Sequence, residues 1–248
     1  MEEQRIKKNP VIQSLFNRKS VRVYEEREIE PEKKQLILEA ACQAPSAGNQ
    51  QLYTIIDITD QKLKEKLSVT CDDQPFIAKA PLVLIFCADA QKWYDAYRSC
   101  GIDARKPESG DILLALEDAA IAAQNGVTAA ESLGIGSCYI GDILENCELH
   151  RELLELPDYV IPAVMVVFGY PTKQQKERKK PKRAAMQYIV HENRYQQLDR
   201  EQLKGMLEHN TPSGNYEAWL CAFCQRKYMS DFSREMSRSV KAYLEKFL

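Results

Sequence analysis

The sequence predicts an α/β fold, an α+β sandwich in which helices cover a central mixed sheet. Two observations carry this prediction. Segments with the composition of strands alternate with segments of helical periodicity along most of the chain, and one Ala-rich segment is long enough to form a central helix. The chain has 248 residues, of which 44% are hydrophobic and 28% charged, as is usual for a globular protein. We therefore expect a single domain over residues 1–248.

The first half of the chain predicts two helices and two strands. A helix is expected at 31–44, with Pro31 in its first turn and an apolar stripe behind it. Alternating β-branched residues predict a strand at 53–58, and a charged helix follows at 61–67. The uninterrupted apolar run at 82–88 is typical of a strand that is buried on both faces.

The second half begins with the long Ala-rich helix at 111–133, which is apolar nearly all round. Such a helix belongs inside a domain or in a dimer interface. A strand at 135–140, a short helix at 147–154 and a strand at 160–168 follow. The tail at about 216–248 is helical and rich in aromatic residues, so we expect it to pack on a partner subunit.

Composition excludes several classes of protein. The net charge is −2, which argues against a nucleic-acid partner. No apolar run reaches the roughly 18 residues that span a membrane, and the acidic start at Glu2 and Glu3 is unlike a signal peptide. We therefore expect no membrane partner and a cytoplasmic location.

The eight cysteines are expected to be free thiols, several of them buried as small apolar residues. Cys221 and Cys224 form a C-x-x-C pair, but the segment around them is helical and no second pair or neighbouring histidine completes a zinc site. The three histidines share no ligand spacing. No metal is predicted.

Two polar motifs suggest an anionic ligand. The segment Arg18-Lys19-Ser20-Val21-Arg22 offers guanidinium and hydroxyl donors to a phosphate, although a solvated helix face has the same composition. The turn Ala44-Pro45-Ser46-Ala47-Gly48-Asn49-Gln50-Gln51 is small and rich in amides, or is simply the broken end of a helix. Together the two motifs favour a ligand with one anionic end and a polyol or heteroaromatic end.

At these two motifs the chain resembles the FMN-dependent nitroreductase family. In that family an Arg-x-Ser-x-Arg segment holds the flavin phosphate, and a Pro-Ser-(Ala/Ser)-x-Asn-x-Gln turn lies beside the ribityl chain and ring. The resemblance implies a nitroreductase-like fold, FMN as cofactor, NADPH or NADH as co-substrate, and a domain-swapped homodimer. The cofactor-binding residues that it implies in these two motifs are Arg18, Lys19, Ser20, Arg22, Pro45, Ser46, Ala47 and Asn49.

Two further segments match the family. Gln74, in Asp72-Asp73-Gln74-Pro75, matches an amide placed against the pyrimidine edge of the flavin, although a polar residue in a loop is the plain alternative. Tyr139-Ile140-Gly141-Asp142 matches a turn that runs along the ring, with a backbone N–H of Gly141 or Asp142 near flavin N5. A strand-ending turn is the alternative there. The resemblance implies no catalytic side chain, because the flavin carries the chemistry.

The basic segment Lys180-Pro181-Lys182-Arg183 matches one that returns to the flavin phosphate. We expect Lys182 and Arg183 to bind the phosphate and residues 176–180 to be solvated, with a nuclear-localisation or heparin patch as the weaker alternative. Residues 92–98 are expected to begin an aromatic loop, from Trp93 to about Gly110, that covers the flavin. A dimer-packing helix is equally consistent with this composition.

The chain also departs from the family pattern. It has Ala47-Gly48 where many larger members have a longer Ser-rich turn, which leaves the side-chain contacts there open. No motif fixes a site for the NADPH 2′-phosphate, although Arg226, Lys227 and Arg238 are available. Coenzyme preference is therefore not predicted.

The function that the resemblance implies is oxidoreduction. Hydride would pass from NAD(P)H through flavin N5 to a small electron-poor acceptor, such as a nitroaromatic, a quinone or free flavin, by a ping-pong mechanism. Two alternatives stay open at the level of sequence. One is a flavin-binding storage or sensor protein with little turnover, and the other is a specialised dehalogenating or flavin-fragmenting relative.

Overall fold

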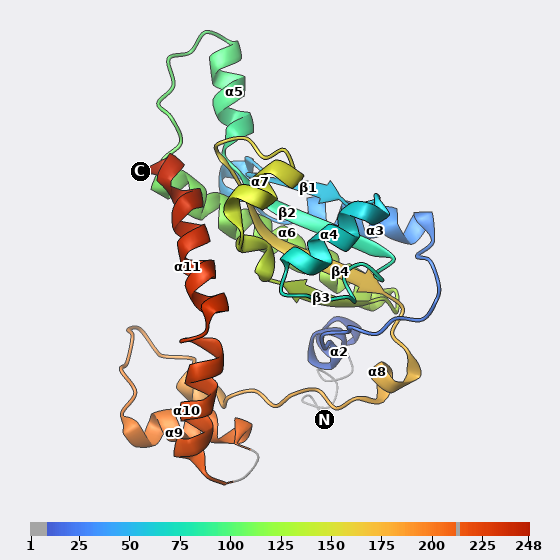
Figure 1. Ribbon diagram of the computed structural model, residues 1–248, viewed down its shortest axis with the longest axis vertical. Coiled ribbons are helices and arrows are strands. Elements are labelled where there is room, and N and C mark those ends of the chain that lie inside the picture. Colours follow the sequence, from blue (N-terminus) through green and yellow to red (C-terminus); the bar gives the residue numbers. More distant parts are fainter. Residues whose placement is uncertain (1–8, 212–213) are drawn as a thin grey trace. The chain divides into compact units, whose positions relative to one another are not determined.

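The computed structural model describes residues 9–211 and 214–248. Its internal contacts divide the chain into two compact units (Figure 1). The sheet unit is Met1–Arg178 with Glu235–Leu248, and the second unit is Lys179–Arg234. Sequence analysis placed no boundary near residue 179, and the expectation that all 248 residues form one flavin-binding domain stays a prediction.

The sheet unit is built on a four-stranded sheet with the order β1-β2-β4-β3. The strands are β1 (Tyr53–Asp57), β2 (Leu82–Asp89), β3 (Gly136–Ile140) and β4 (Val160–Gly169). All three neighbouring pairs are antiparallel, so the expectation of a mixed sheet is wrong in this respect. Among the described residues, parallel pairing occurs at the isolated bridge between Ser20 and Ser137. Alternation of strands and helices usually indicates parallel crossovers, but here the segment through α4 (Gln61–Thr70) joins two antiparallel neighbours.

Strand β2 is buried over its whole length, which confirms the expectation from its apolar run. Its alternate side chains enter two different core clusters because successive residues of a strand point to opposite faces. Leu84 and Phe86 pack with α3 (Pro31–Cys42) and α6 (Ser109–Ser132). Ile85 and Cys87 pack with α4 on the other face.

The long helix α6 has apolar side chains on both sides, as its composition predicts. Its inner side, with Ala119, Ala122 and Ala123, is fully buried in the core. Its outer side exposes Leu113 (60%) and Ile121 (40%) in the single chain. One side of the helix therefore packs in the domain core, and apolar side chains on the other side are exposed in the single chain.

Residues 92–98 lie in helix α5 (Gln91–Ser99), so the structure has the helix and not a loop that begins at residue 92. The alternative that this helix packs in a dimer stays a prediction. Asp89 Oδ1 accepts hydrogen bonds from the backbone N–H groups of Gln91 (3.0 Å) and Lys92 (3.1 Å). These contacts satisfy donors that have no partner inside the first turn of a helix, so the helix starts directly after β2. The loop proper occupies the residues between α5 and α6.

The remaining helices are shorter. In the sheet unit they are α2 (Pro10–Asn17), α7 (Cys147–Leu153) and α8 (Lys173–Glu177), and in the second unit α9 (Arg200–Leu207) and α10 (Tyr216–Lys227). Helix α11 (Asp231–Leu244) begins in the second unit and continues into the sheet unit. The tail was expected to be helical, and it consists mainly of the two helices α10 and α11.

The end of the tail packs on its own chain. Tyr243 is fully buried and Phe247 is 2% exposed, and both lie in a core cluster with Ala88 and Ile161 of the sheet. The expectation that the whole tail packs on a partner is therefore wrong for residues 235–248, which belong to the core of the sheet unit of the same chain. For residues 216–234 that expectation stays a prediction.

Four of the eight cysteines, Cys71, Cys87, Cys138 and Cys147, are buried. Burial raises the pKa of the Cys71 and Cys87 thiols to about 12, so these two residues act as small apolar groups. In residues 9–211 and 214–248 no helix combines the length and hydrophobicity needed to cross a membrane.

Candidate functional site

The segment from Arg18 to Tyr24 lies against the sheet because two glycines, one in β3 and one in β4, make room for it. The backbone N–H of Val21 donates to the carbonyl of Ser137 (2.9 Å), and Val21 is buried. A Cβ on Gly136 would lie 2.5 Å from Cγ2 of Val21, and a Cβ on Gly169 would lie 2.5 Å from Cδ1 of Tyr24. The position of the cationic segment therefore depends on glycines far away in sequence.

Three of the expected phosphate-binding residues converge around Cys138 of β3. Burial raises the pKa of the Cys138 thiol, and the charge or hydrogen bonding of Arg22, Ser20 and Arg18 partly offsets this rise. Nη1 of Arg18 is buried and has no hydrogen-bond partner among the described residues. Unmet buried donors are costly, so this cradle fits an anionic oxygen ligand such as a phosphate.

Lys19 does not join this cradle, which corrects the sequence expectation. Its Nζ donates to the carbonyl of Lys176 (2.6 Å) and to that of Arg178, at the end of α8. Arg178 in turn donates to the carbonyl of Ser20, and Lys176 pairs with Glu25 (3.0 Å). Lys176 and Arg178 are exposed, as expected of a solvated segment, and their contacts also help to hold the cationic segment in place.

The turn after β3 brings together the other residues expected near the flavin ring. Nε2 of Gln74 donates to Oδ2 of Asp142 (2.9 Å), which ties the loop after α4 to the turn. The Tyr139 hydroxyl donates to Oε1 of Gln124 on α6 (3.2 Å), and burial raises its pKa to about 12. Ile140 is buried, whereas a Cβ on Gly141 would meet nothing within 4 Å. The backbone at Gly141 thus faces open space that a flat ligand could approach.

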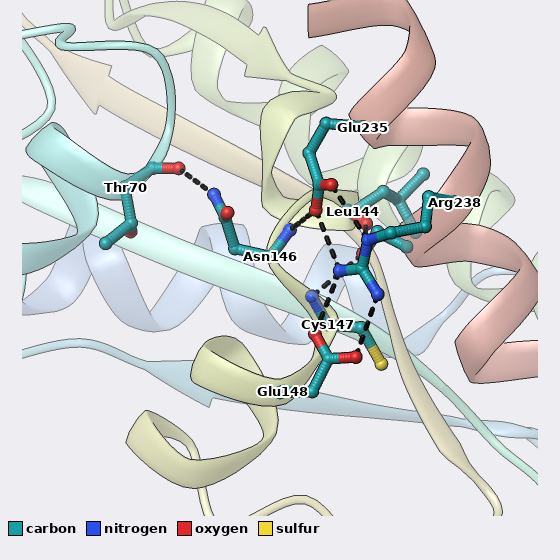
Figure 2. Close-up of polar contacts among 8 residues, drawn as sticks. Thr70, Leu144, Asn146, Cys147, Glu148, Glu235 and Arg238 are labelled. Atoms are coloured by element: carbon teal, nitrogen blue, oxygen red, sulfur yellow. Dashed lines mark hydrogen bonds and ion pairs between the residues drawn. The ribbon is translucent and has the colours of Figure 1, made fainter.

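Helix α11 contacts the next part of the chain, residues 144–148 at the start of α7 (Figure 2). The Ser239 hydroxyl donates to the carbonyl of Leu144 (2.6 Å) and accepts from the N–H of Cys147 (2.8 Å). Oε1 of Glu235 accepts from the N–H of Asn146 (3.1 Å). Side chains of α11 therefore cap the first turn of α7, which has no side-chain cap of its own.

Asn146 and Arg238 make further contacts at the start of α7. Nδ2 of Asn146 donates to the carbonyl of Thr70 (2.9 Å), at the end of α4. Arg238 makes two bonds of 2.9 Å to the carboxylate of Glu148 and also pairs with Glu235 (Figure 2). Sequence analysis considered Arg238 only for the NADPH 2′-phosphate, but its guanidinium is engaged with these two carboxylates.

Polar groups within the turn at residues 44–51 bond to one another. Ser46 Oγ accepts from the N–H of Gln51 (3.0 Å), and Oδ1 of Asn49 accepts from the side chain of Gln51 (2.7 Å). Gly48 and Asn49 both have φ of 56°, which is the conformation that Gly and Asn tolerate best. Pro45 is exposed and Ala47 half-buried.

Sequence analysis missed the residue that fixes this turn. Asp118 of α6 is 2% exposed, and its two carboxylate oxygens accept from the N–H groups of Ala47 (2.9 Å) and Leu52 (3.0 Å). The one available signal was an acidic residue in the middle of an otherwise Ala-rich helix. A buried carboxylate needs such donors, and the turn supplies two of them.

A cavity of about 270 Å³ lies beside this turn. Its lining includes Trp93, Tyr97, Arg105 and Leu114, and Nε1 of Trp93 donates to the carbonyl of Gln50 (2.8 Å). The aromatic segment that was expected to cover the ligand thus packs against the turn at 44–51. Its role over the ligand stays a prediction.

The two groups of residues lie at opposite edges of the sheet. The turn at 44–51 precedes β1, and the turn at 139–142 follows β3, and these are the two outer strands. Three strand spacings separate them, about 14 Å. One chain therefore does not gather all the expected flavin residues at a single edge.

The second unit holds the other expected phosphate ligands. Lys182 and Arg183 are exposed residues of a loop in that unit, so their convergence with Arg18 and Arg22 stays a prediction. Cys221 and Cys224 are exposed on α10. Within residues 9–211 and 214–248, no three or more His, Cys, Asp or Glu side chains are arranged to hold a metal ion.

Comparison with known proteins decides the family. A model of the Nitroreductase family matches residues 15–170, which is more than half of the chain. The chain belongs to the nitroreductase family. The matched region contains the cradle around Arg18, the turn at 44–51 and the turn at 139–142, whereas Lys182 and Arg183 lie beyond it.

Individual nitroreductase relatives match more of the chain. It is 32% identical over 240 residues to the FMN reductase (NAD(P)H) of Bacillus subtilis, which covers 96% of this chain and 92% of that one. It is 35% identical over 195 residues to the oxygen-insensitive NADPH nitroreductase of Salmonella typhimurium, covering 79% and 78%. Among solved structures, the NADPH:FMN oxidoreductase from Vibrio harveyi in complex with NAD+ matches with a TM-score of 0.76 and 25% identity, covering 96% and 97%.

Proposed function

We propose that this member of the nitroreductase family is an FMN-dependent oxidoreductase that uses NAD(P)H to reduce small electron-poor acceptors, such as nitroaromatics, quinones or free flavin. The observation that carries the proposal is the cradle beside β3, where a buried guanidinium N–H of Arg18 has no partner among the described residues. The names of the relatives supply the substrates: FMN and NAD(P)H for the Bacillus protein, and NADPH for the Salmonella nitroreductase.

FMN, when bound, would accept two electrons and a proton from NAD(P)H and pass them to the second substrate. Arg18, Ser20 and Arg22 would hold its phosphate, because a doubly charged phosphate is well matched to guanidinium and hydroxyl donors. Gln74 and the backbone from Tyr139 to Asp142 would hold the ring. The chain contributes binding and orientation, and we assign no side chain as nucleophile or base.

The active form that we propose is a homodimer, with Ser46 and Asn49 of one chain completing the site of the other. Two observations support this. The turn at 44–51 lies at the sheet edge opposite to the cradle, and the outer side of α6 exposes Leu113 and Ile121. Exposed apolar side chains on a long central helix are suited to a subunit interface. The contributions of Lys182 and Arg183, the packing of residues 216–234 on a partner and the cytoplasmic location belong to the same proposal.

The test is the cofactor itself. We expect the purified protein to be yellow, to release FMN on denaturation and to be bleached rapidly by NADPH or NADH. Release of FAD, or a colourless protein that fails to take up added FMN, would overturn the proposal. Slow or absent bleaching would instead favour the storage or sensor alternative.

A pair of adjacent variants tests the cradle. Arg18→Ala should weaken FMN binding by about 1.5–3 kcal/mol, the usual range for a hydrogen bond to a charged group. Lys19→Ala is the matched control, because Lys19 contacts the carbonyls of α8 instead of the cradle, and it should keep FMN affinity. The assignment of the phosphate site fails if Arg18→Ala and Arg22→Ala both bind FMN as the wild type does.

A further inference from the structure

We infer that Asp142 is a positioning residue that fixes the side-chain amide of Gln74, so that Gln74 presents only its carbonyl oxygen to a ligand and acts as a hydrogen-bond acceptor. The inference rests on the proposed function, since the ligand in question is FMN. The inference goes beyond the proposed function because it assigns the direction of one hydrogen bond and the residue that sets this direction.

Both N–H groups of the Gln74 amide already have partners. Nε2 donates to the carbonyl of Cys71 (2.8 Å) and to Oδ2 of Asp142 (2.9 Å). An amide nitrogen carries two hydrogens, so these two bonds use its whole donor capacity. For Oε1, by contrast, the described residues offer no donor.

The chemistry of the partners forces this orientation. A backbone carbonyl and an ionised carboxylate can only accept hydrogen bonds. If the amide were rotated by 180°, Oε1 would face two acceptors, and three electron-rich oxygens would lie together without a proton between them. The oxygen and nitrogen of the amide are therefore distinguished by their neighbours.

The backbone around Gln74 is fixed as well. Its N–H donates to the carbonyl of Ser68 (2.7 Å), and its own carbonyl accepts from the N–H of Ile77 (3.0 Å). Asp72 and Asp73 before it both have positive φ, 62° and 48°, which closes the loop tightly after α4. Asp142 is itself held in a turn, where its carbonyl accepts from the N–H of Glu145 (3.1 Å). The amide thus lies between two fixed acceptors and has little freedom to rotate.

The consequence for a flavin is specific. The pyrimidine edge of the isoalloxazine ring has two carbonyl acceptors, O2 and O4, with one donor, N3–H, between them. An amide that offers only an acceptor can pair with N3–H and cannot donate to O2 or O4. Without Asp142 one N–H of Gln74 would be free, and the amide could turn to offer that N–H to a carbonyl instead.

The test compares FMN with 3-methyl-FMN, which lacks the N3–H donor. Affinities of both flavins for the apoprotein are measured by fluorescence quenching in the wild type, Gln74→Ala, Asp142→Leu and Asp142→Asn. We expect the wild type to prefer FMN by at least about five-fold, the effect of one hydrogen bond, and Gln74→Ala to lose this preference. Asp142→Leu should bind FMN more weakly and discriminate less. Asp142→Asn should behave as the wild type, because its amide oxygen still accepts from Nε2.

A second readout needs no flavin. In the apoprotein the side-chain NMR signal of the Gln74 NH2 group should show two hydrogens protected from exchange, with protection of one lost in Asp142→Leu and retained in Asp142→Asn. The inference is overturned if Gln74→Ala discriminates between the two flavins as the wild type does, or if Asp142→Leu keeps both the wild-type preference and the protection. If neither flavin binds any of the four proteins, the proposed function fails, and the NMR result alone then decides whether the amide is fixed.

Discussion

Val21 occupies the space that a side chain on Gly136 would need. The Cγ2 and Cβ atoms of Val21 lie 2.5 and 2.8 Å from the position of a Cβ on that glycine. Real Cβ atoms do not approach other atoms so closely, and the second atom is rigidly attached to the backbone. The packing of Val21 on β3 therefore requires glycine at position 136, and this packing places Arg18, Ser20 and Arg22 around Cys138.

The first prediction follows from this contact. Gly136→Ala should displace the cationic segment, lower the free energy of unfolding by about 1–3 kcal/mol and weaken FMN binding, as overpacking of a filled site does. Unfolding in urea and titration with FMN measure the two effects. Gly110→Ala is the matched control, because a Cβ there would meet nothing within 4 Å, and alanine is the better helix former at the start of α6.

The outcome that contradicts this account is specific. If Gly136→Ala bound FMN with wild-type affinity, the position of residues 18–22 would not depend on the glycine. If Gly110→Ala were equally damaging, the loss would come from alanine substitution in general.

The pattern of strands and of the longer helices could be predicted from the sequence, because it depends on local periodicity. The apolar run of β2 and the Ala-rich run of α6 are examples, and their bounds were expected to within two residues. The direction of the strands could not be predicted, because it depends on which strands become neighbours. A mixed sheet was expected, whereas β1, β2, β4 and β3 pair antiparallel throughout.

The residues of the candidate site also fall into two groups, those that the sequence predicts from a local motif and those that it does not. Motifs carried by one short segment, such as Arg18 to Arg22 or Tyr139 to Asp142, were recognisable, and the structure brings these two together. Residues that act on a distant segment had little or no local signal. Asp118 fixes the turn at 44–51 from the middle of α6, and Ser239 caps α7 from the end of the chain. The role of Lys19 was misassigned for the same reason, because its partners lie in α8.

The second prediction compares two residues of α11, Ser239, which contacts the turn before α7, and Arg238, which contacts Glu148 in α7. Ser239→Ala should lower the free energy of unfolding by about 2 kcal/mol, because it removes the partner of the buried Cys147 N–H and of the Leu144 carbonyl. Arg238→Ala should cost less than Ser239→Ala, although it removes more bonds, since the Arg238 side chain is 49% exposed and so largely hydrated. Urea denaturation gives both values. A greater loss for Arg238→Ala would contradict the view that burial, and not the number of bonds, decides the contribution.

The third prediction concerns Glu145, a carboxyl that is 6% exposed and has one oxygen without a partner among the described residues. Burial, with the nearby charges of Asp142, Asp72 and Glu235, raises its pKa to about 7. The folded state therefore holds this proton at a pH where the unfolded state has lost it. The contribution of Glu145 to stability is fully present below about pH 4.5 and falls as the pH rises to about 7.

The check is the difference between Glu145→Gln and the wild type. At pH 5 the two should be similarly stable, and at pH 8 the variant should be more stable by about 1 kcal/mol, allowing for screening by solvent. The pH dependence of the wild type alone would not isolate Glu145. Burial lowers the pKa of His150, so this residue changes the stability in the opposite direction over part of the same pH range. Urea denaturation at several pH values measures it. A difference that is constant with pH would show that Glu145 does not titrate abnormally.

The last prediction concerns the outer side of α6. Leu113 and Ile121 are eight residues apart, so they lie on one stripe of the helix, and Gln124, which accepts from the Tyr139 hydroxyl, is also exposed on this helix. If this stripe is the subunit interface, the double variant Leu113→Lys and Ile121→Lys should be monomeric in sedimentation velocity and should lose FMN together with the dimer. Leu36→Lys on α3 is the control, because Leu36 is 50% exposed and lies outside the proposed interface, and that variant should remain dimeric and yellow.

The loss of FMN is the informative part, because a dimer that does not share its sites would release monomers with the flavin still bound. A folded wild-type monomer that retains FMN would overturn the dimer, and a double variant that stays dimeric and yellow would move the interface away from α6.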